Sequence, residues 1–343
     1  MASTSLTKTY TTIVTDTLEG FLTEELQDQV IDESAAMAWL FGRDLKELQQ
    51  YRLASDIPSD QLREKTAIKE VEGNVINVPV RWRRTNTVKF IPSTGKLSTV
   101  TADPHTTAQA QWKILAGSVT VSEAEVAKNL GSEVQIIDYT QGLVEDLKES
   151  FANYFAVALF SDGSIDNGDA ITGLQALCSD VPAVGTVMQI NRANETWWRN
   201  NATDGGAVAL TEAHVRTMFN TCSRGKMHPT FLVMDQTRYE AFEAFLTANA
   251  RYEMSENAQM AQLGFNHFTY KGAIVTWDRN CPAGSVYFLT KKGIKLAINP
   301  HMKFHMREWV NEINGLSKVG IAVLMCELVT TNPRLLGVRF NVG

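Results

Sequence analysis

The segment from Trp82 to Trp112 constrains the fold of this chain more than any other. Apolar and polar residues alternate on both flanks, which predicts two strands of one hairpin. Between the strands lies a long stretch rich in Thr, Ser, Asn and Lys, around the turn Pro92-Ser93-Thr94-Gly95. Two-stranded ribbons are marginally stable in water, and structureless loops of this length are uncommon in compact domains. The segment is therefore expected to need a partner surface from another copy of the chain.

Composition limits the classes of protein that remain. The chain has 343 residues, 44% of them hydrophobic and 20% charged, which is typical of a globular protein of one to three domains. Its net charge of -6 argues against sequence-specific nucleic-acid binding through a basic face. The four cysteines are far apart and are expected to be reduced and structural. Without a signal pattern or a long apolar run, we expect a soluble intracellular protein with no membrane partner.

Charge is distributed unevenly along the chain. Residues 1–50 contain nine acidic and three basic residues, whereas residues 81–113 contain six basic residues and one acidic residue. One interpretation is that both segments are simply solvated faces. The other is that they dock subunit against subunit.

Hydrophobic periodicity predicts the main elements. We expect helices from Thr17 to Ile31 and from Ser34 to Tyr51, the latter interrupted near Gly42, and a short helix after Ser122. The hairpin strands are expected at 69–83 and 108–121. A long helix of roughly seven turns is expected from Ile136 to Phe160, with Phe151 and Phe155 on its apolar face. These two residues are expected to be buried against Val323 and Met325.

The later part of the chain predicts a mixed α/β layer. A helix from Leu210, C-capped by Gly225, precedes a strand from Thr230 to Met234 and a helix capped by Asp235. Further strands are expected at 273–277, 286–290, 294–298, 304–310, 321–329 and 335–342. Trp197 and Trp198 are expected to pack against a neighbouring element or subunit, rather than to form a carbohydrate or base platform.

No motif for catalysis or cofactor binding occurs in the sequence. The run from Asp162 to Asp169 fails the EF-hand pattern, because Asn167 stands where glycine is needed and Gly173 where the bidentate glutamate belongs. Pro300 and a strand pattern keep His301 and His305 from sharing one helical face. No catalytic residue, metal site or cofactor is therefore expected.

The order of the elements resembles the major capsid protein family of tailed bacteriophages, the Hong Kong 97-type fold. Local phrases are similar too, and they follow one another along most of the chain: Ile171-Thr172-Gly173-Leu174, Asn191-Arg192 leading into Thr196-Trp197-Trp198-Arg199, Pro229-Thr230-Phe231-Leu232-Val233-Met234-Asp235, Lys271-Gly272-Ala273-Ile274-Val275, and Leu328-Val329-Thr330-Thr331-Asn332-Pro333-Arg334.

The resemblance implies an α+β fold with four parts. An N-terminal arm (1–60) precedes an extended E-loop hairpin (74–118). A peripheral domain (61–73, 119–168 and 301–330) contains a long spine helix (134–161), and an axial domain comprises 169–300 and 331–343. Some members begin with a scaffold-like helical domain that a protease removes. Because the hairpin starts near residue 74 here, no such domain fits ahead of it, and scaffolding is expected to come from a separate protein or to be absent.

The resemblance also implies the function, which is structural and not enzymatic. Pentamers and hexamers would form the icosahedral shell of a virion, assembled in the host bacterial cytoplasm around double-stranded DNA that is contacted non-specifically. Portal, scaffolding and decoration proteins would be partners. An encapsulin-type compartment of the same fold is the alternative, and an intracellular α/β enzyme with an unrecognised site is a further one.

The E-loop charges are the candidate inter-subunit contacts. In the family this loop lies across a neighbouring subunit, which implies that its basic residues face acids there: Arg81, Arg83, Arg84, Lys89 and Lys96. The acidic partners would lie in the arm (Glu24, Glu25, Asp28, Asp32 and Glu33) or in the long helix (Glu145, Asp146 and Glu149).

Overall fold

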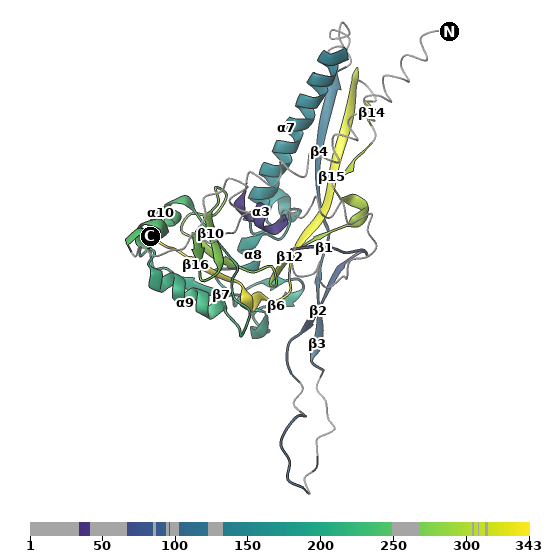
Figure 1. The fold of residues 1–343 in the computed structure, drawn as a ribbon. Helices are drawn as coiled ribbons and strands as arrows, with labels where there is room; N and C mark the ends of the chain where they lie inside the picture. Colours follow the sequence, from purple (N-terminus) through teal and green to yellow (C-terminus); the bar gives the residue numbers. More distant parts are fainter. Residues whose placement is uncertain are drawn as a thin grey trace, which may run out of the picture.

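The computed structural model describes residues 34–41, 67–84, 87–93, 96, 103–122, 133–248, 268–303, 305–307, 309–312 and 315–343. Glu24, Glu25, Asp28, Asp32 and Glu33, the first predicted helix and the short helix after Ser122 lie outside these residues. The described residues form two six-stranded sheets and two small two-stranded ones. Figure 1 shows three parts: a tall strand pair beside a long helix, a second sheet with helices, and a hairpin that projects from the opposite end.

The first sheet is built around one long strand, β15 (Ser317–Thr330). One path through the sheet runs β1-β12-β15-β13, and β4 and β14 also pair with β15. The bounds of these strands are β1 (Ile68–Glu70), β4 (Lys113–Ser122), β12 (Ile294–Ile298), β13 (His305–Met306) and β14 (Val310–Asn311). The domain boundaries expected from the sequence placed residues 294–298 in the axial domain. In the structure these residues form β12, which pairs with β15 in this sheet.

The long helix α7 (Glu133–Leu159) lies along β4 and spans about 40 Å. Its apolar face covers a small core made of Val119, Val121, Leu147, Phe151 and Ala322. Val323 and Met325 were predicted to meet Phe151, and that prediction is wrong. Ala322 pairs with Gly117 beneath the helix, and because adjacent strand residues face opposite sides, Val323 and Met325 face away from it.

The second sheet runs β7-β16-β11-β8-β10-β9. Its strands are β7 (Asn201–Asp204), β8 (Phe231–Met234), β9 (Phe268–Tyr270), β10 (Ala273–Trp277), β11 (Val286–Leu289) and β16 (Gly337–Phe340). Every residue of β8 and β11 is buried, as expected for central strands covered on both faces.

Two helices, α9 (Glu212–Cys222) and α10 (Gln236–Ala248), accompany this sheet. The Thr211 side chain caps α9 by accepting from the His214 backbone N–H. The helix buries the predicted residues Val215, Met218, Phe219 and Cys222. The predicted cap at Gly225 is wrong, because α9 ends at Cys222 and Gly225 lies in the following turn with φ +61°.

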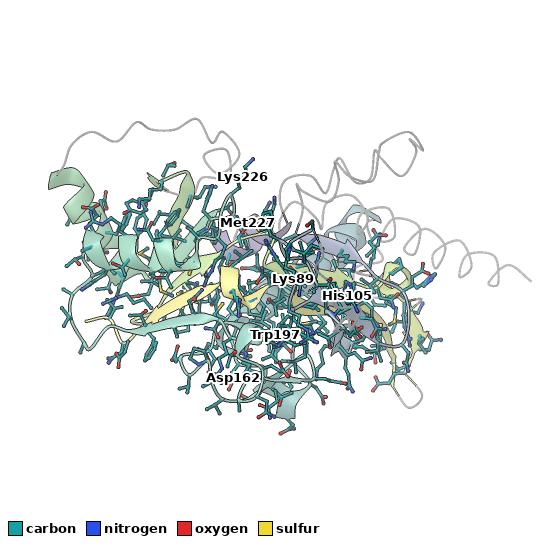
Figure 2. All side chains as sticks on the ribbon, turned by 90° about the horizontal axis from the view of Figure 1, so that it is seen from below. Lys89, His105, Asp162, Trp197, Lys226 and Met227 are labelled. Carbon is teal, nitrogen blue, oxygen red and sulfur yellow. The ribbon has the colours of Figure 1, made fainter. Side chains whose placement is uncertain are left out.

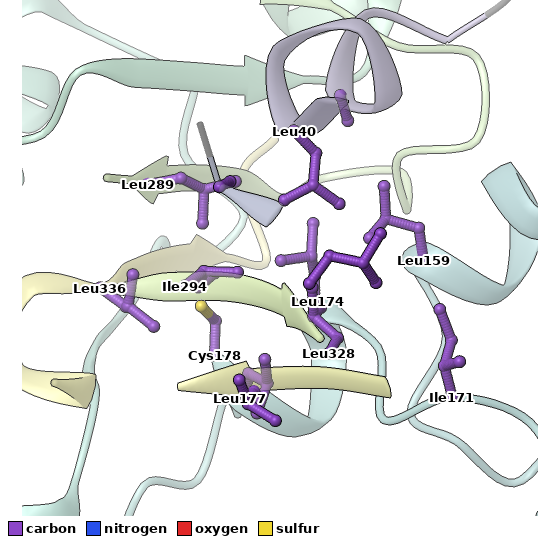
Figure 3. Close-up of a cluster of buried hydrophobic side chains, with 14 of the residues drawn as sticks. Leu40, Leu159, Ile171, Leu174, Leu177, Cys178, Leu289, Ile294, Leu328 and Leu336 are labelled. Atoms are coloured by element: carbon purple, nitrogen blue, oxygen red, sulfur yellow. The ribbon is translucent and has the colours of Figure 1, made fainter. Parts of the chain in front are cut away.

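The largest core joins both sheets, the end of α7 and two short helices, α3 (Ala35–Phe41) and α8 (Leu174–Leu177). Figure 3 shows Leu40, Leu159, Ile171 and Leu328 converging in it from distant parts of the chain. Gly173 allows the chain to turn back against the end of α7. A Cβ at this position would lie 2.6 Å from the Ala158 carbonyl oxygen and 2.9 Å from that of Leu159.

The hairpin consists of β2 (Ile76–Arg81) and β3 (His105–Ala110), with Ile76 opposite Ala110 and Arg81 opposite His105. The predicted second strand, 108–121, is divided, because β4 begins at Lys113 and pairs with β15 instead. The base of the hairpin packs on its own subunit through Ile76, Val78 and Val80. The expectation of a partner surface is therefore limited to the residues beyond this base. A second small ribbon pairs β5 (Thr186–Val187) with β6 (Ile190–Asn191).

Candidate assembly surfaces

The hairpin tip exposes three apolar side chains. Val88 is 87% exposed, Phe90 is fully exposed at 106% and Ile91 is 42% exposed. They lie beyond the strands β2 and β3, in the part of the hairpin that projects from the body (Figure 1). The charges of this segment were singled out from the sequence, whereas this apolar group was missed, although the run Val88-Lys89-Phe90-Ile91 is its signal.

The basic residues of the hairpin divide into two kinds. Arg81, Arg84, Lys89 and Lys96 are exposed; Figure 2 looks at the molecule from below, with Lys89 labelled. Arg83 is exposed too, but its guanidinium lies over the Trp82 ring, 4.2 Å from the centroid, and its Nε donates to the Asp103 carbonyl oxygen at 3.2 Å. Arg83 is therefore partly engaged within its own subunit, and the other four remain the stronger candidates for an inter-subunit contact.

The exposed surface of α7 carries both acidic and apolar side chains. Asp146 and Glu149 are exposed. Tyr154, which is apolar except for its hydroxyl, is 37% exposed, and the apolar Val157 is 47% exposed. Asp146 and Glu149 are three residues apart, as are Tyr154 and Val157, so each pair is adjacent on the helix surface, and Val157 lies nearly in line with Asp146 further along the helix, whereas Glu149 and Tyr154 lie on opposite sides of that line. Glu145 also belongs to α7, but its side chain lies outside the described atoms. In the part of the chain that the structure describes, no ion pair joins these acids to the basic residues of the hairpin.

Tyr154 is also linked to the loop that follows α7. Its hydroxyl donates to the Asp166 carboxylate, and this hydrogen bond raises the pKa of Tyr154. The loop forms a 3-10 turn, Ile165–Gly168, in which Asp166 and Asn167 have positive φ. This segment is an ordinary turn, and among the described residues no group of three His, Cys, Asp or Glu side chains could hold a metal ion.

The described part of the expected arm is buried in its own subunit. All side chains described between Ser34 and Leu40 are at most 7% exposed. Ser34 Oγ and the Ala36 backbone N–H both donate to Asp278, and Trp39 stacks on Phe231 with centroids 4.8 Å apart. The described side chains between Ser34 and Leu40 are therefore part of the core rather than of a surface that could reach a neighbour.

The four residues expected as structural core are placed as follows. Phe151 is 7% exposed and lies in the small core between α7 and the long strands. Phe155 is 4% exposed and lies in the large core. Trp198 is fully buried, whereas Trp197 is half-buried and lies against Trp82 at the base of the hairpin. The four cysteines are free and buried, and burial raises the pKa of Cys222 to about 12, so they are inert thiols.

Glu327 is a buried carboxyl that the sequence did not reveal. It is 1% exposed on β15, and its Oε1 accepts from the Thr172 backbone N–H at 2.8 Å. Among the residues that the structure describes, none forms a hydrogen bond with its Oε2. Burial raises the pKa of Glu327 to about 7, and the nearby Lys113 opposes the shift. This carboxyl lies at the junction of β15 with the loop after α7, not on an exposed surface.

Within the described residues, no helix is long and apolar enough to cross a membrane. No protein-family model matches the chain, and no curated protein matches it.

Solved structures do match, at low sequence identity and over most of each chain. The capsid asymmetric unit of cyanophage A-1(L) is similar with a TM-score of 0.61 and 14% identity, covering 84% of this chain and 95% of that chain. The capsid of an empty GTA particle gives a TM-score of 0.54 at 14% identity, covering 87% and 98%. The SrpI encapsulin of Synechococcus elongatus PCC 7942 gives 0.51 at 14% identity, covering 86% and 95%. The neighbours are structural shell proteins rather than enzymes, and the chain has their fold, the Hong Kong 97-type capsid fold.

Proposed function

We propose that this chain is the repeating subunit of a closed protein shell, in which the hairpin tip of one copy docks on the exposed surface of α7 in the next. The observation that carries the proposal is the exposure of Val88, Phe90 and Ile91 at the end of a projecting hairpin. Exposed apolar groups of this kind mark interaction sites. The fold shared with a phage capsid and an encapsulin supports a second copy of the chain as the partner.

The two surfaces match in chemistry. The tip combines basic residues with apolar ones, and the exposed surface of α7 carries the acids Asp146 and Glu149 and, further along the helix, the partly apolar pair Tyr154 and Val157. A single exposed ion pair is worth only about 0.2–1 kcal/mol. Repetition over a closed shell makes such contacts additive in effect, because each docked copy holds its neighbours at a high effective concentration. Weak individual contacts also allow misplaced subunits to dissociate before the shell closes.

The proposal assigns roles to the parts of the fold. Residues 74–118 act as the E-loop, and α7 acts as the spine helix of a peripheral domain built on 61–73, 119–168 and 301–330. Residues 169–300 and 331–343 form the axial domain, except that β12 (294–298) belongs with the peripheral sheet. Residues 1–60 form an arm only in the part outside the buried segment 34–41.

We further propose that the shell is a tailed-phage capsid of pentamers and hexamers. It would be assembled in the bacterial cytoplasm, would enclose double-stranded DNA, and would use a portal, a separate scaffolding protein and a decoration protein. An acidic chain suits a container that holds DNA without binding it tightly, because basic contacts would bind DNA in a salt-dependent way. An encapsulin-type compartment is the second candidate, supported by the similarity to the SrpI encapsulin.

Electron microscopy of the purified chain, with its scaffold where one exists, tests the shell. We expect closed particles of uniform diameter. A stable monomer or dimer over a wide range of concentration and salt would refute the proposal. The contents separate the two candidates, because nucleic acid inside the particles indicates a virion and a folded protein cargo indicates a compartment.

A charge-swap experiment tests the docking itself. Arg84→Glu with Lys89→Glu should abolish particles while leaving a soluble, folded subunit. Adding Asp146→Lys and Glu149→Lys should restore particles, because the pairing is then reversed rather than removed. Arg216→Glu, an exposed charge on α9, is the matched control. Normal particles from the hairpin variant would contradict the proposed contact.

A further inference from the structure

We infer that Trp82, Trp197 and Trp198 form a fixed joint that sets the direction in which the hairpin leaves the body. The hairpin could then present its tip to a neighbouring subunit without first being ordered by it. The inference rests on the proposed docking of the tip for its purpose, but its geometry stands within a single subunit. These three residues are positioning residues, because none of them belongs to the tip.

The joint is a continuous stack of rings. Trp82 directly follows β2, and its ring lies 6.0 Å from the Trp197 ring at an angle of 28°. Trp197 meets Trp198 edge-on, with centroids 5.4 Å apart and planes at 63°. The Arg83 guanidinium covers the outer face of Trp82. Aromatic pairs in these geometries and a cation over an indole face attract each other beyond the burial of their surface.

The inner end of the stack is anchored in the rigid body. Trp198 is fully buried and its indole N–H donates to the Val187 carbonyl oxygen at 3.1 Å. The Trp197 indole N–H donates to the Glu195 carboxylate. Arg199 Nε donates to the carbonyl oxygen of Arg192, whose own side chain is buried and binds the last carbonyl groups of α8. The rings nearest the body therefore have fixed positions.

The outer end of the stack is attached to both strands of the hairpin. The Trp82 backbone N–H donates to Pro104 at 3.1 Å, and Arg83 reaches the Asp103 carbonyl oxygen. At the other end of the paired strands, and independently of the stack, the Gln109 N–H donates to the Met188 carbonyl oxygen, in the turn between β5 and β6, at 3.0 Å. The stack thus contacts the hairpin where the paired strands end and the projecting part begins.

The exposure of the rings separates this role from a core role. Trp198 is buried and the half-buried Trp197 packs against the large core, whereas Trp82 is half-buried and is not part of that core. Both half-buried aromatic side chains remain partly in water and stack against each other. A role in holding the hairpin explains this arrangement. A Trp82 variant is therefore expected to fold.

The test is hydrogen–deuterium exchange on the full-length, unassembled subunit. In Trp82→Ala and in Trp197→Ala, the amides of β2, β3 and residue 82 should exchange at least tenfold faster, whereas those of α7 and β8 should not change. Trp82→Phe should retain most of the protection, because a ring remains in the stack. Unchanged exchange in both alanine variants would overturn the inference, and so would an equal increase throughout the molecule.

Two further variants keep the test decisive. Arg83→Met removes only the outermost member of the stack and can be measured even where an alanine variant is insoluble. A smaller increase in amide exchange, confined to the hairpin, is expected. No increase in the hairpin would count against the joint. Phe90→Ser leaves the joint intact, so exchange at the hairpin base should stay as in the wild type while particles are lost. Normal assembly of Phe90→Ser would refute the proposed docking of the tip but would leave the inference about the joint unaffected.

Discussion

Gly117 of β4 lies directly beneath the ring of Phe151 of α7. A Cβ at residue 117 would collide with the Phe151 ring and would lie 2.9 Å from Leu147 Cδ1. The opposite strand carries Ala322, another small residue, at the paired position. Two small residues side by side thus create the depression in the sheet that receives the phenylalanine, and the long helix can approach the strands closely.

The first prediction follows from this contact. Gly117→Val should lower the free energy of unfolding by about 1–3 kcal/mol, because the buried ring cannot move away without disturbing its neighbours. Thermal unfolding of the soluble subunit measures the effect. Ala116→Val is the matched control, since residue 116 is exposed on the other face of β4 and a strand accommodates valine well. Equal melting temperatures for the two variants would mean that α7 does not press on Gly117.

The second prediction concerns Phe151 itself. Phe151→Ala should cost about 3–5 kcal/mol, because it leaves a cavity between α7 and the two long strands. Most of the subunit should then be lost as insoluble protein before assembly. Ser93→Ala, at the exposed tip of the hairpin, should leave the soluble yield unchanged and affect only the yield of particles. Normal soluble protein and normal shells from Phe151→Ala would show that α7 is not part of the core.

Local patterns predicted the elements well, and their partners poorly. The alternation in β2, the apolar face of α9 and the long helix were all visible in the sequence. The sequence did not show which residues of β15 face α7. Ile321 to Cys326 is an uninterrupted apolar run, and without alternation neither face of the strand is marked as the inner one. Parallel pairing of β1 with β12 joins segments from opposite ends of the chain, which no local pattern can indicate.

The candidate surfaces show the same division. Charge marked the hairpin as a contact, but only the structure shows that Arg83 is held over Trp82. Trp197 and Trp198 were expected to pack against something, and their partner at the hairpin base comes from a segment more than a hundred residues earlier in the chain. Contacts of this kind depend on the fold as a whole.

The third prediction uses the buried carboxyl of Glu327. Its pKa is raised from 4.5 in the unfolded chain to about 7 in the folded subunit. Below pH 4.5 the group is protonated in both states and has no effect. As pH rises from about 4.5 to 7, the unfolded chain loses the proton first, so wild-type stability falls over this window and stays reduced above it.

Glu327→Gln removes this titration. The variant should be more stable than the wild type at pH 8, by roughly 3 kcal/mol at most, and the difference should disappear near pH 4.5. Thermal unfolding of the subunit at several pH values gives the comparison. Glu72→Gln, at an exposed position, should follow the wild type throughout. A constant difference between Glu327→Gln and the wild type across the range would disprove the assigned titration.

The last prediction concerns the attachment of α3 to the core. The Asp278 carboxylate accepts from Ser34 Oγ and from the Ala36 N–H at the start of α3, and from the Asn280 N–H on its own loop. Asp278→Ala leaves these buried donors without an acceptor and should cost at least about 1–3 kcal/mol. Hydrogen exchange should rise in residues 34–41 while β8 stays protected.

Ser34→Ala removes a single donor and should cost less than Asp278→Ala. Because the two side chains act through one contact, the double variant should be hardly less stable than Asp278→Ala alone. Asp278→Asn keeps an acceptor oxygen and should recover part of the loss. If the two single effects simply added, Ser34 and Asp278 would be acting independently, and α3 would be held by the packing of Trp39 on Phe231 rather than by this carboxylate.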